Sequence, residues 1–263
     1  MKGSVAEVFG QKIRLLPQHV PQEHLTSVAS IGAGAFSYCS GLTSIMIPDS
    51  VKYIGYSAFN GCSSLTSIII PDSVTSIGWG AFMNCSGLTS VTIGNSVTSI
   101  GEYAFYGCNK LVEVINNSSL NITKGSEDNG YVAYYAINVK KGGSSDIVNK
   151  DGYLFYTYDN VNYLLGYVGT DTELVLPENY NGNNYEIYRC AFCMCRELTS
   201  VTIPDGVTSI GEYAFDGCSG LKEIHYNGTK AQWNAISKDY CWNFCTGYYT
   251  IYCTDGNLTK DEA

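Results

Sequence analysis

Cysteine offers the most chemistry in this sequence of 263 residues, which contains eleven of them. Cys190, Cys193 and Cys195 form one group, and Cys241 and Cys245 lie four positions apart. Because structural zinc takes four ligands, typically from two closely spaced pairs, these five thiols are candidate metal ligands. A local disulfide and unpaired thiols fit the same spacing. We favour unpaired thiols, with no metal and no cofactor.

Histidine is the other residue type that could do chemistry near neutral pH. His19 and His24 lie five positions apart beside prolines, and we interpret them as exposed loop residues rather than as a metal-binding pair. His225 follows Glu223 on the outward side of a predicted strand, where we expect a surface contact rather than the base of a Ser or Cys nucleophile. The sequence shows no glycine-rich phosphate loop and no calcium loop. We therefore predict that the chain is not an enzyme.

The elements that carry these side chains belong to a unit of 23 residues that occurs six times. Each copy contains Ala-Phe, a cysteine three residues after the Phe, and a leucine three residues further on. The copies begin at Ile31, Ile54, Ile77, Ile100, Ile187 and Ile210. Their cysteines are Cys39, Cys62, Cys85, Cys108, Cys195 and Cys218. A fixed period of this length is typical of a solenoid, in which the copies stack and share one core.

Each repeat has two halves with different periods. The first half predicts a short helix, because Ala35, Cys39 and Leu42 recur at the spacing of one helical face. The second half predicts a strand, as in residues 88–93, where Val91 and Ile93 point inward and their neighbours point outward. A second short strand follows, as in residues 74–77.

Stacking of these elements predicts a curved solenoid. Strands stack about 4.8 Å apart, whereas packed helices stand about 8–10 Å apart, so we expect the strands to line the concave side. Equivalent cysteines would then lie on helices that are too far apart for a disulfide. We interpret the six repeat cysteines as small buried apolar residues, and we expect Cys190 and Cys193 to be more exposed than Cys195.

The pattern Leu-x-x-Ile-x-Ile-Pro-x-x-Val-x-x-Ile-Gly-x-x-Ala-Phe-x-x-Cys resembles the BspA-like leucine-rich repeats, a family of bacterial and protozoan surface proteins. The resemblance covers residues 31–120 and 174–230, and the intervening segment and the tail also look like parts of that family. It implies an α/β fold, a right-handed leucine-rich-repeat solenoid. It also implies a location at the cell surface or in secretions, and binding to other proteins, host extracellular matrix proteins among them.

We predict a single leucine-rich-repeat domain over residues 1–263. It would consist of an N-terminal cap (1–30), regular repeats (31–120), an irregular β segment (121–173), further regular repeats (174–230) and a C-terminal cap (231–263). In the tail, Thr229 and Gln232 form a capping-box pattern that opens a helix through Trp233 and Ile236. Residues 248–253 predict a final strand.

The irregular segment is rich in tyrosine, with eight between positions 131 and 167. Residues 131–139, 153–158 and 163–168 predict strands, and the signals Asp151-Gly152 and Asp159-Asn160 predict hairpin turns. Because tyrosine favours strands, a structural role is the simpler interpretation. The alternative is an exposed aromatic patch that contacts a glycan or a protein.

Composition excludes several classes of partner. The net charge is −9 and the isoelectric point is about 4.7, which argues against nucleic acid and anionic membranes because both require a basic surface. No apolar run approaches the roughly 20 residues of a membrane span. Residues 1–10 show no apolar core of a signal peptide, so the surface location rests on the resemblance.

We place the binding site on the strand positions that point away from the core, since solenoids use this extended surface for partners. These positions are Ser44, Met46, Ser67, Ile69, Ser90, Thr92, Glu113, Ile115, Ser200, Thr202, Glu223 and His225. The expected function is a protein-interaction or adhesion module. Two alternatives stay open, namely a structural spacer that presents another module and a glycan binder that uses the tyrosine-rich segment.

Overall fold

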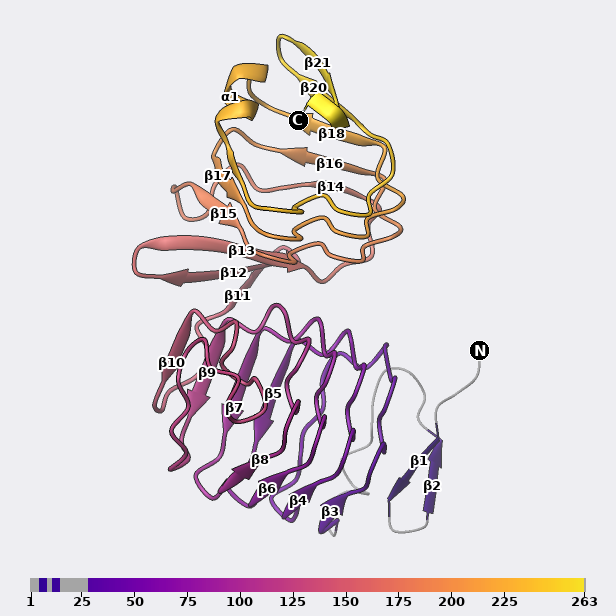
Figure 1. Ribbon diagram of the computed structural model, residues 1–263, viewed down its shortest axis with the longest axis vertical. Coiled ribbons are helices and arrows are strands. Elements are labelled where there is room, and N and C mark those ends of the chain that lie inside the picture. Colours follow the sequence, from indigo (N-terminus) through magenta and orange to yellow (C-terminus); the bar gives the residue numbers. More distant parts are fainter. Residues whose placement is uncertain (1–4, 9–10, 15–27, 263) are drawn as a thin grey trace. The chain divides into compact units, whose positions relative to one another are not determined.

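The computed structural model describes residues 5–8, 11–14 and 28–262, and it divides the chain into two compact units, Met1–Ser145 and Asp146–Ala263 (Figure 1). In the first unit, β1 (Val5–Val8) and β2 (Gln11–Arg14) form an antiparallel pair. His19 and His24, and most of the predicted N-terminal cap, lie outside the described residues. The single domain over residues 1–263 stays a prediction.

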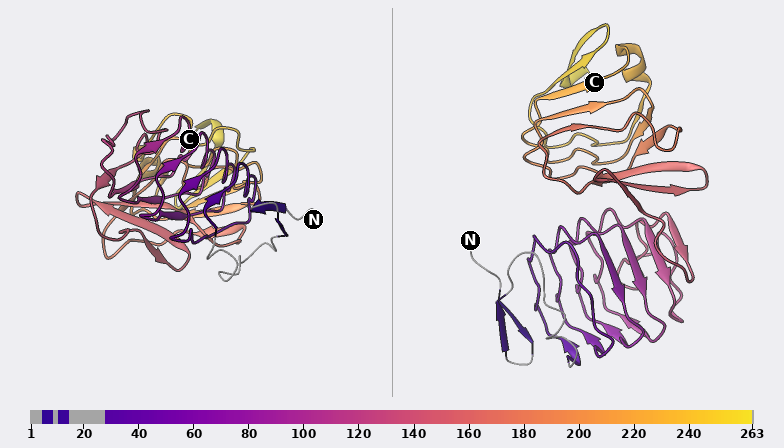
Figure 2. Two further views of the ribbon diagram at one scale, coloured as in Figure 1. Left: turned by 90° about the horizontal axis from the view of Figure 1, so that it is seen from below. Right: turned by 180° about the vertical axis from the view of Figure 1, so that it is seen from behind.

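Unit 1 is a β-solenoid in which successive 23-residue turns, or rungs, contribute strands to two parallel sheets. The first sheet contains β5 (Ser67–Ile70), β7 (Ser90–Ile93), β9 (Glu113–Asn116) and β10 (Asn138–Lys140). The second contains β3 (Ser30–Ile31), β4 (Tyr53–Ile54), β6 (Ser76–Ile77) and β8 (Ser99–Ile100). Each residue pairs with its counterpart one repeat later, as Ser67 does with Ser90. Figure 2 shows these rungs side by side from behind.

The predicted short helix of each repeat is wrong. The segments that carry Ala-Phe, which we call the Ala-Phe loops (residues 55–62 and their equivalents), consist of consecutive tight turns. Two positions in each loop take the left-handed conformation, for example Ser57 with φ 50° and Gly61 with φ 74°. A right-handed helix cannot pass through such residues. Within residues 28–262, α1 (Lys230–Ala235) is the single α-helix.

The alternating conformation of the Ala-Phe loops lets the backbone bond in two directions. The N–H groups of Ser57, Phe59 and Gly61 donate to carbonyls of the next rung at 2.9, 2.7 and 2.8 Å. The intervening N–H groups, such as that of Asn60, donate locally to the residue three positions earlier. The loops therefore satisfy their backbone groups by a third ladder between rungs, where a helix would have satisfied them within itself.

This ladder sets the spacing of the side chains beneath it. The rings of Phe36, Phe59, Phe82 and Phe105 form one column, with adjacent centroids 5.0–5.1 Å apart and planes within 14° of parallel. The predicted helix spacing of about 8–10 Å is therefore wrong, and the reason given for a curved solenoid no longer holds. Curvature and right-handedness stay predictions.

The repeat cysteines form a second buried column in which each thiol makes a specific bond. Sγ of Cys62, Cys85 and Cys108 donates to the carbonyl of the preceding rung's Phe at 3.1–3.2 Å. Cys218 does the same to Phe192 at 3.1 Å. The prediction of small buried residues is confirmed for these four.

Cys195 differs from the other repeat cysteines because it is exposed, so the prediction that it points into the core is wrong. Cys190 is buried and Cys193 is half-buried, so the expectation that both are more exposed than Cys195 is wrong.

Unit 2 repeats the same architecture and begins with a hairpin. Its first sheet contains β11 (Val148–Lys150), β12 (Tyr153–Tyr158), β13 (Val161–Tyr167), β15 (Tyr185–Ile187), β17 (Val207–Ile210) and β19 (Ser237–Lys238). Its second contains β14 (Glu173–Val175), β16 (Ser200–Ile203), β18 (Glu223–Tyr226), β20 (Thr250–Cys253) and β21 (Gly256–Thr259). The strands β11, β12 and β13 pair antiparallel with one another in sequence, and β13 pairs with the first parallel strand, β15. They thereby cover the open edge of the stack.

The C-terminal end of unit 2 is covered by the predicted helix and by a hairpin. Both bonds of the capping box between Thr229 and Gln232 are present, and Trp233 of α1 is fully buried, so this prediction is confirmed. The predicted final strand is β20, and the antiparallel β21 beside it was not predicted. A short 3-10 helix, η2 (Lys260–Glu262), follows.

The tyrosine-rich segment is only partly made of the predicted strands. β12 and β13 form the predicted hairpin, and Tyr153 and Tyr156 are buried in it. Residues 131–137, in contrast, are turns, and only the end of the predicted strand over 131–139 is found, as β10. Glycine and alanine among the tyrosines allow these turns to follow the Ala-Phe loop of the preceding rung, where Phe105 N–H donates to the carbonyl of Gly130 at 2.7 Å.

We expect unit 1 to lose stability at alkaline pH because of the buried thiols. Burial raises the pKa of Cys62 well above its usual range, so the folded thiol stays protonated while the unfolded thiol ionises above about pH 8.5. The unfolded state then binds fewer protons than the folded state. For each such thiol the free energy of unfolding falls by up to about 1.4 kcal/mol per pH unit. In urea titrations at pH 7.5 and 9.5, Cys62→Ala should reduce this loss by about 1 kcal/mol. The control Cys245→Ala, at an exposed thiol, should leave the loss of unfolding free energy between the two pH values unchanged. The same loss in the parent and in both variants would contradict the account.

Candidate binding surface

The predicted binding residues fall on the outward side of one sheet in each unit, which we call the outward strand face of that unit. In unit 1 this face consists of the outward side chains of β5, β7 and β9 together with the extended residues 42–48, which form no assigned strand. Eight of the twelve predicted residues belong to it, and four belong to unit 2. In β5 the inward Ile68 and Ile70 are buried while the outward Ser67 and Ile69 are exposed, so the predicted alternation is confirmed for this strand.

Two apolar side chains stand out on the outward strand face of unit 1. Met46 is 65% exposed and Ile69 is 66% exposed. Ser44 and Ser67, their polar neighbours, are also exposed, and Thr92 on the next strand is half-buried. Exposed apolar groups on a polar background are typical of interaction sites when they gather on one surface.

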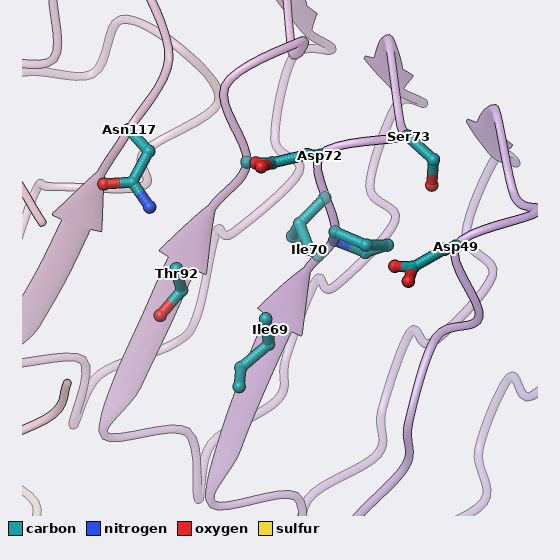
Figure 3. A pocket seen from close by; sticks show the side chains of 9 residues that line it. Asp49, Ile69, Ile70, Asp72, Ser73, Thr92 and Asn117 are labelled. Atoms are coloured by element: carbon teal, nitrogen blue, oxygen red, sulfur yellow. The ribbon is translucent and has the colours of Figure 1, made fainter. Parts of the chain in front are cut away.

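An open depression of about 540 Å³ is lined in part by Ile69. Its floor is formed by Ile69, Ile70 and Thr92, and its rim by the corner that follows each strand. Figure 3 shows Asp49, Asp72 and Asn117 along this rim. The surface thus combines an apolar floor with acidic groups at one edge.

The rim is held in place by hydrogen bonds between rungs. Both carboxylate oxygens of Asp72 accept from Asn95 of the next rung, one from its backbone N–H at 2.8 Å and one from its amide at 3.0 Å. The side-chain oxygen of Asn117 accepts from the backbone N–H of Gly142 at 3.0 Å. A partner would therefore meet a largely preformed surface, which lowers the entropy cost of binding.

Three predicted residues of unit 1 are not accessible. Ser90, Glu113 and Ile115 are 5%, 0% and 1% exposed, so the expectation that they face solvent is wrong. Glu113 forms an ion pair with Lys140 of β10 at 2.8 Å. The strand β10 interrupts the regular repeat and brings a charged partner that the repeat pattern does not predict.

The four predicted residues of unit 2 lie together on β16 and β18. Ser200 and Thr202 are half-buried. Nε2 of His225 lies 3.0 Å from Oε2 of Glu223, and the imidazole stacks on Tyr252 with centroids 5.0 Å apart. The predicted contact between His225 and Glu223 is confirmed. Both side chains are nearly half exposed, as in an ordinary surface pair.

Sequence reasoning missed two features of these faces. Val175 of β14 is 70% exposed on the outward strand face of unit 2. The acidic rim was also missed, although a signal for it exists in the recurring Pro-Asp corners at Asp49, Asp72 and Asp205. Asp49 and Asp72 lie 23 positions apart in unit 1, each after a proline, so the period places them on successive rungs.

The thiol groups near residue 190 do not build a metal centre in the described part of the chain, where no group of three or more His, Cys, Asp and Glu residues is arranged to hold an ion. None of the eleven cysteines, all within residues 28–262, forms a disulfide. Among the described residues there is also no helix with the length and apolar character needed to cross a bilayer.

The sequence matches the family described as BspA type leucine rich repeat region, in six copies over residues 24–127 and 172–260. No curated protein matches it significantly. The family is one of repeat proteins, and its match includes the strands of both outward strand faces.

Several solved bacterial leucine-rich repeat proteins are similar to the chain. One from T. pallidum is 25% identical, with 75% of this chain and 62% of that chain covered and a TM-score of 0.32. A leucine rich cell surface protein from Faecalibacterium prausnitzii is 24% identical, with 81% and 80% covered and a TM-score of 0.32. One from Bacteroides ovatus is 25% identical, with 85% and 52% covered and a TM-score of 0.35. The chain thus spans less than two thirds of the T. pallidum and B. ovatus proteins.

The ion pair between Glu113 and Lys140 should be important for the stability of unit 1. Lys140→Met would leave the fully buried carboxylate without its cation, which costs about 3–5 kcal/mol. The matched control is His225→Ala, because Glu223 takes the place of Glu113 in unit 2 and is nearly half exposed; this change should cost less than about 1 kcal/mol. Urea unfolding of both variants measures the difference. A cost below about 1 kcal/mol for Lys140→Met would show that the pair is not buried as described.

Proposed function

The chain belongs to the BspA type leucine rich repeat family, and from this premise we propose that it is a non-enzymatic protein-interaction module. The proposed site is the outward strand face of unit 1, around Met46, Ile69 and the depression beside them. The proposal includes display at a cell surface or secretion, and host extracellular matrix proteins as one class of partner. Unit 2 carries a second outward strand face, on which Val175 is exposed.

One observation carries this proposal, namely that Met46 and Ile69 are exposed on the same strand face and that Ile69 lines a depression with an acidic rim. In a stacked repeat, the inward positions are fixed by the core, whereas the outward positions can take any residue that suits solvent. Serine or threonine would suffice there, as Ser67 and Thr92 show. Methionine and isoleucine gain nothing from solvent exposure, so a partner that buries them explains their presence.

The acidic rim adds a preference for positively charged partners. Asp49 and Asp72 stand on one edge of the depression (Figure 3), and the chain as a whole carries a net charge of −9. Such a surface attracts basic groups and repels acidic ones, an effect that weakens as the salt concentration rises.

A structural spacer remains the second candidate. The observation that favours it is the uniform ladder of unit 1, in which each rung bonds to the next along two sheets and along the Ala-Phe loops. Such a stack keeps its form without a ligand and could present another module.

The test is surface-plasmon binding to a panel of fibronectin, laminin and collagens at physiological salt. We expect the parent chain to bind at least one of them and the double variant Met46→Asp/Ile69→Asp to bind it at least tenfold more weakly. Tyr53→Asp is the matched control, since Tyr53 is 42% exposed on β4 of the other sheet. It should bind like the parent.

Two outcomes would overturn the proposal. Equal binding by the parent and a folded double variant would move the site away from the outward strand face. No binding to any protein of the panel would favour the spacer.

A further inference from the structure

A continuous row of aromatic side chains runs along the Ala-Phe loops of unit 1, on the side away from both sheets' outward faces. We call it the aromatic ridge, and it consists of Tyr56, Trp79, Tyr103, Tyr106, Tyr131, Tyr134 and Tyr135. Each ring touches the next. Tyr56 and Trp79 are stacked at 4.8 Å, Trp79 meets Tyr103 at 5.8 Å, and Tyr103 stacks on Tyr131 at 5.7 Å. Tyr106, Tyr134 and Tyr135 continue the row with edge and tilted contacts of 4.7–5.4 Å.

The repeat does not require aromatic residues at these positions. Tyr56 and Trp79 are the third residues of their copies, and the equivalent positions hold Ala33, Glu102, Arg189 and Glu212. The Ala-Phe loop forms in all these copies. The ridge is therefore an addition to the fold, confined to successive rungs of unit 1 and to the turns at residues 131–135.

The ridge is also well exposed. Its members Tyr56, Trp79, Tyr103, Tyr106 and Tyr134 are 36–52% exposed. If each aromatic residue offers about 200–250 Å² in total, these five together expose roughly 400–500 Å². That is about half of the surface that one partner contributes to a standard protein interface, so the ridge fits the centre of an interface rather than a whole one.

The geometry of the rings favours a protein over a sugar. Neighbouring rings occupy part of one another's faces, by stacking in Tyr56–Trp79 and Tyr103–Tyr131 and by edge-to-face contact in pairs such as Trp79–Tyr103. A pyranose ring stacks its C–H groups on an open aromatic face. Tyrosine and tryptophan held rigidly by their neighbours, in contrast, are the residue types that dominate protein interfaces.

The charges around the ridge indicate the kind of protein. Glu102 takes the place of Trp79 in the next rung, and the loop before Tyr131 contains Lys124, Glu127 and Asp128. Desolvation and a hydrogen bond to Glu127 both raise the pKa of the Tyr131 hydroxyl, which places this carboxylate at the ridge. The surroundings are thus net negative, like the whole chain, so a second copy of the chain would be repelled.

We propose that the aromatic ridge is the centre of a second interface, for a protein segment in which lysine or arginine alternates with apolar side chains. Apolar groups would pack against the rings, and the cations would meet Glu102 and Glu127. This surface is separate from the outward strand face, and it would bind whether or not that face does.

The test starts from a phage-displayed library of random twelve-residue peptides selected on the full chain. Enriched peptides are synthesised, and their affinities are measured by fluorescence anisotropy. We expect them to combine basic with apolar residues and to bind Trp79→Ala/Tyr106→Ala at least tenfold more weakly than the parent. The matched control is Tyr240→Ala/Tyr248→Ala, because both tyrosines are more than 80% exposed in unit 2. It should bind like the parent.

A charge variant keeps the proposal testable if the ridge variant does not fold. Glu102→Lys leaves the rings intact and should weaken the selected peptides several-fold, more strongly at low salt. Failure to enrich any peptide, enrichment of peptides without basic residues, or equal affinity for all variants would overturn the proposal. Binding of cellohexaose, xylohexaose or laminarihexaose that is lost in the ridge variant would overturn it in favour of a glycan surface.

Discussion

The structure depends on one constraint, which is that every rung must hydrogen-bond to the next at the spacing of a β-ladder along all three of its sides. Two sides meet it with strands, and the third meets it with the Ala-Phe loops, whose alternate N–H groups reach the next rung. A helix on that side would use its N–H groups internally and would hold the rungs too far apart. The loops therefore accept left-handed residues such as Tyr103 and Asn84, each of which costs of order 1–3 kcal/mol.

The same spacing decides which side chains are possible. At about 5 Å per rung, an inward position must stack on its own counterpart, which suits flat Phe rings and the small Cys thiols that donate to the preceding carbonyl. Close approach also explains Gly78 and Gly101, where an added Cβ would lie 2.6–2.8 Å from the backbone of the previous rung. Outward side chains need not fit against the core or against the backbone of the previous rung. For this reason the apolar Met46 and Ile69, and the aromatic ridge, point to partners rather than to folding.

The period of the sequence predicted the solenoid, most of the strands of its regular rungs and their inward side chains, and the capping-box pattern at Thr229 predicted the helix α1. It did not predict the Ala-Phe loops, because Ala35, Cys39 and Leu42 have helical spacing whether or not the chain is helical. The signal against a helix was the glycine that several copies have at the same loop position, for example Gly61 and Gly107, where φ is positive.

Burial of Glu113 and Ile115 could not be predicted either, since it accompanies a non-repetitive segment. The acidic rim and the aromatic ridge arise from stacking, which brings together residues 23 positions apart.

Residue-resolved amide hydrogen exchange, measured by NMR, tests the central claim most directly. If the Ala-Phe loops form a third ladder, the amides of Ser57, Phe59 and Gly61 should exchange as slowly as those of Ile68 and Val91 in the strands β5 and β7. All of these groups are bonded between rungs, and they should be released together when the stack opens. Exchange of the loop amides within minutes, while the strand amides stay protected, would contradict the account and would leave the two sheets alone to hold the rungs together.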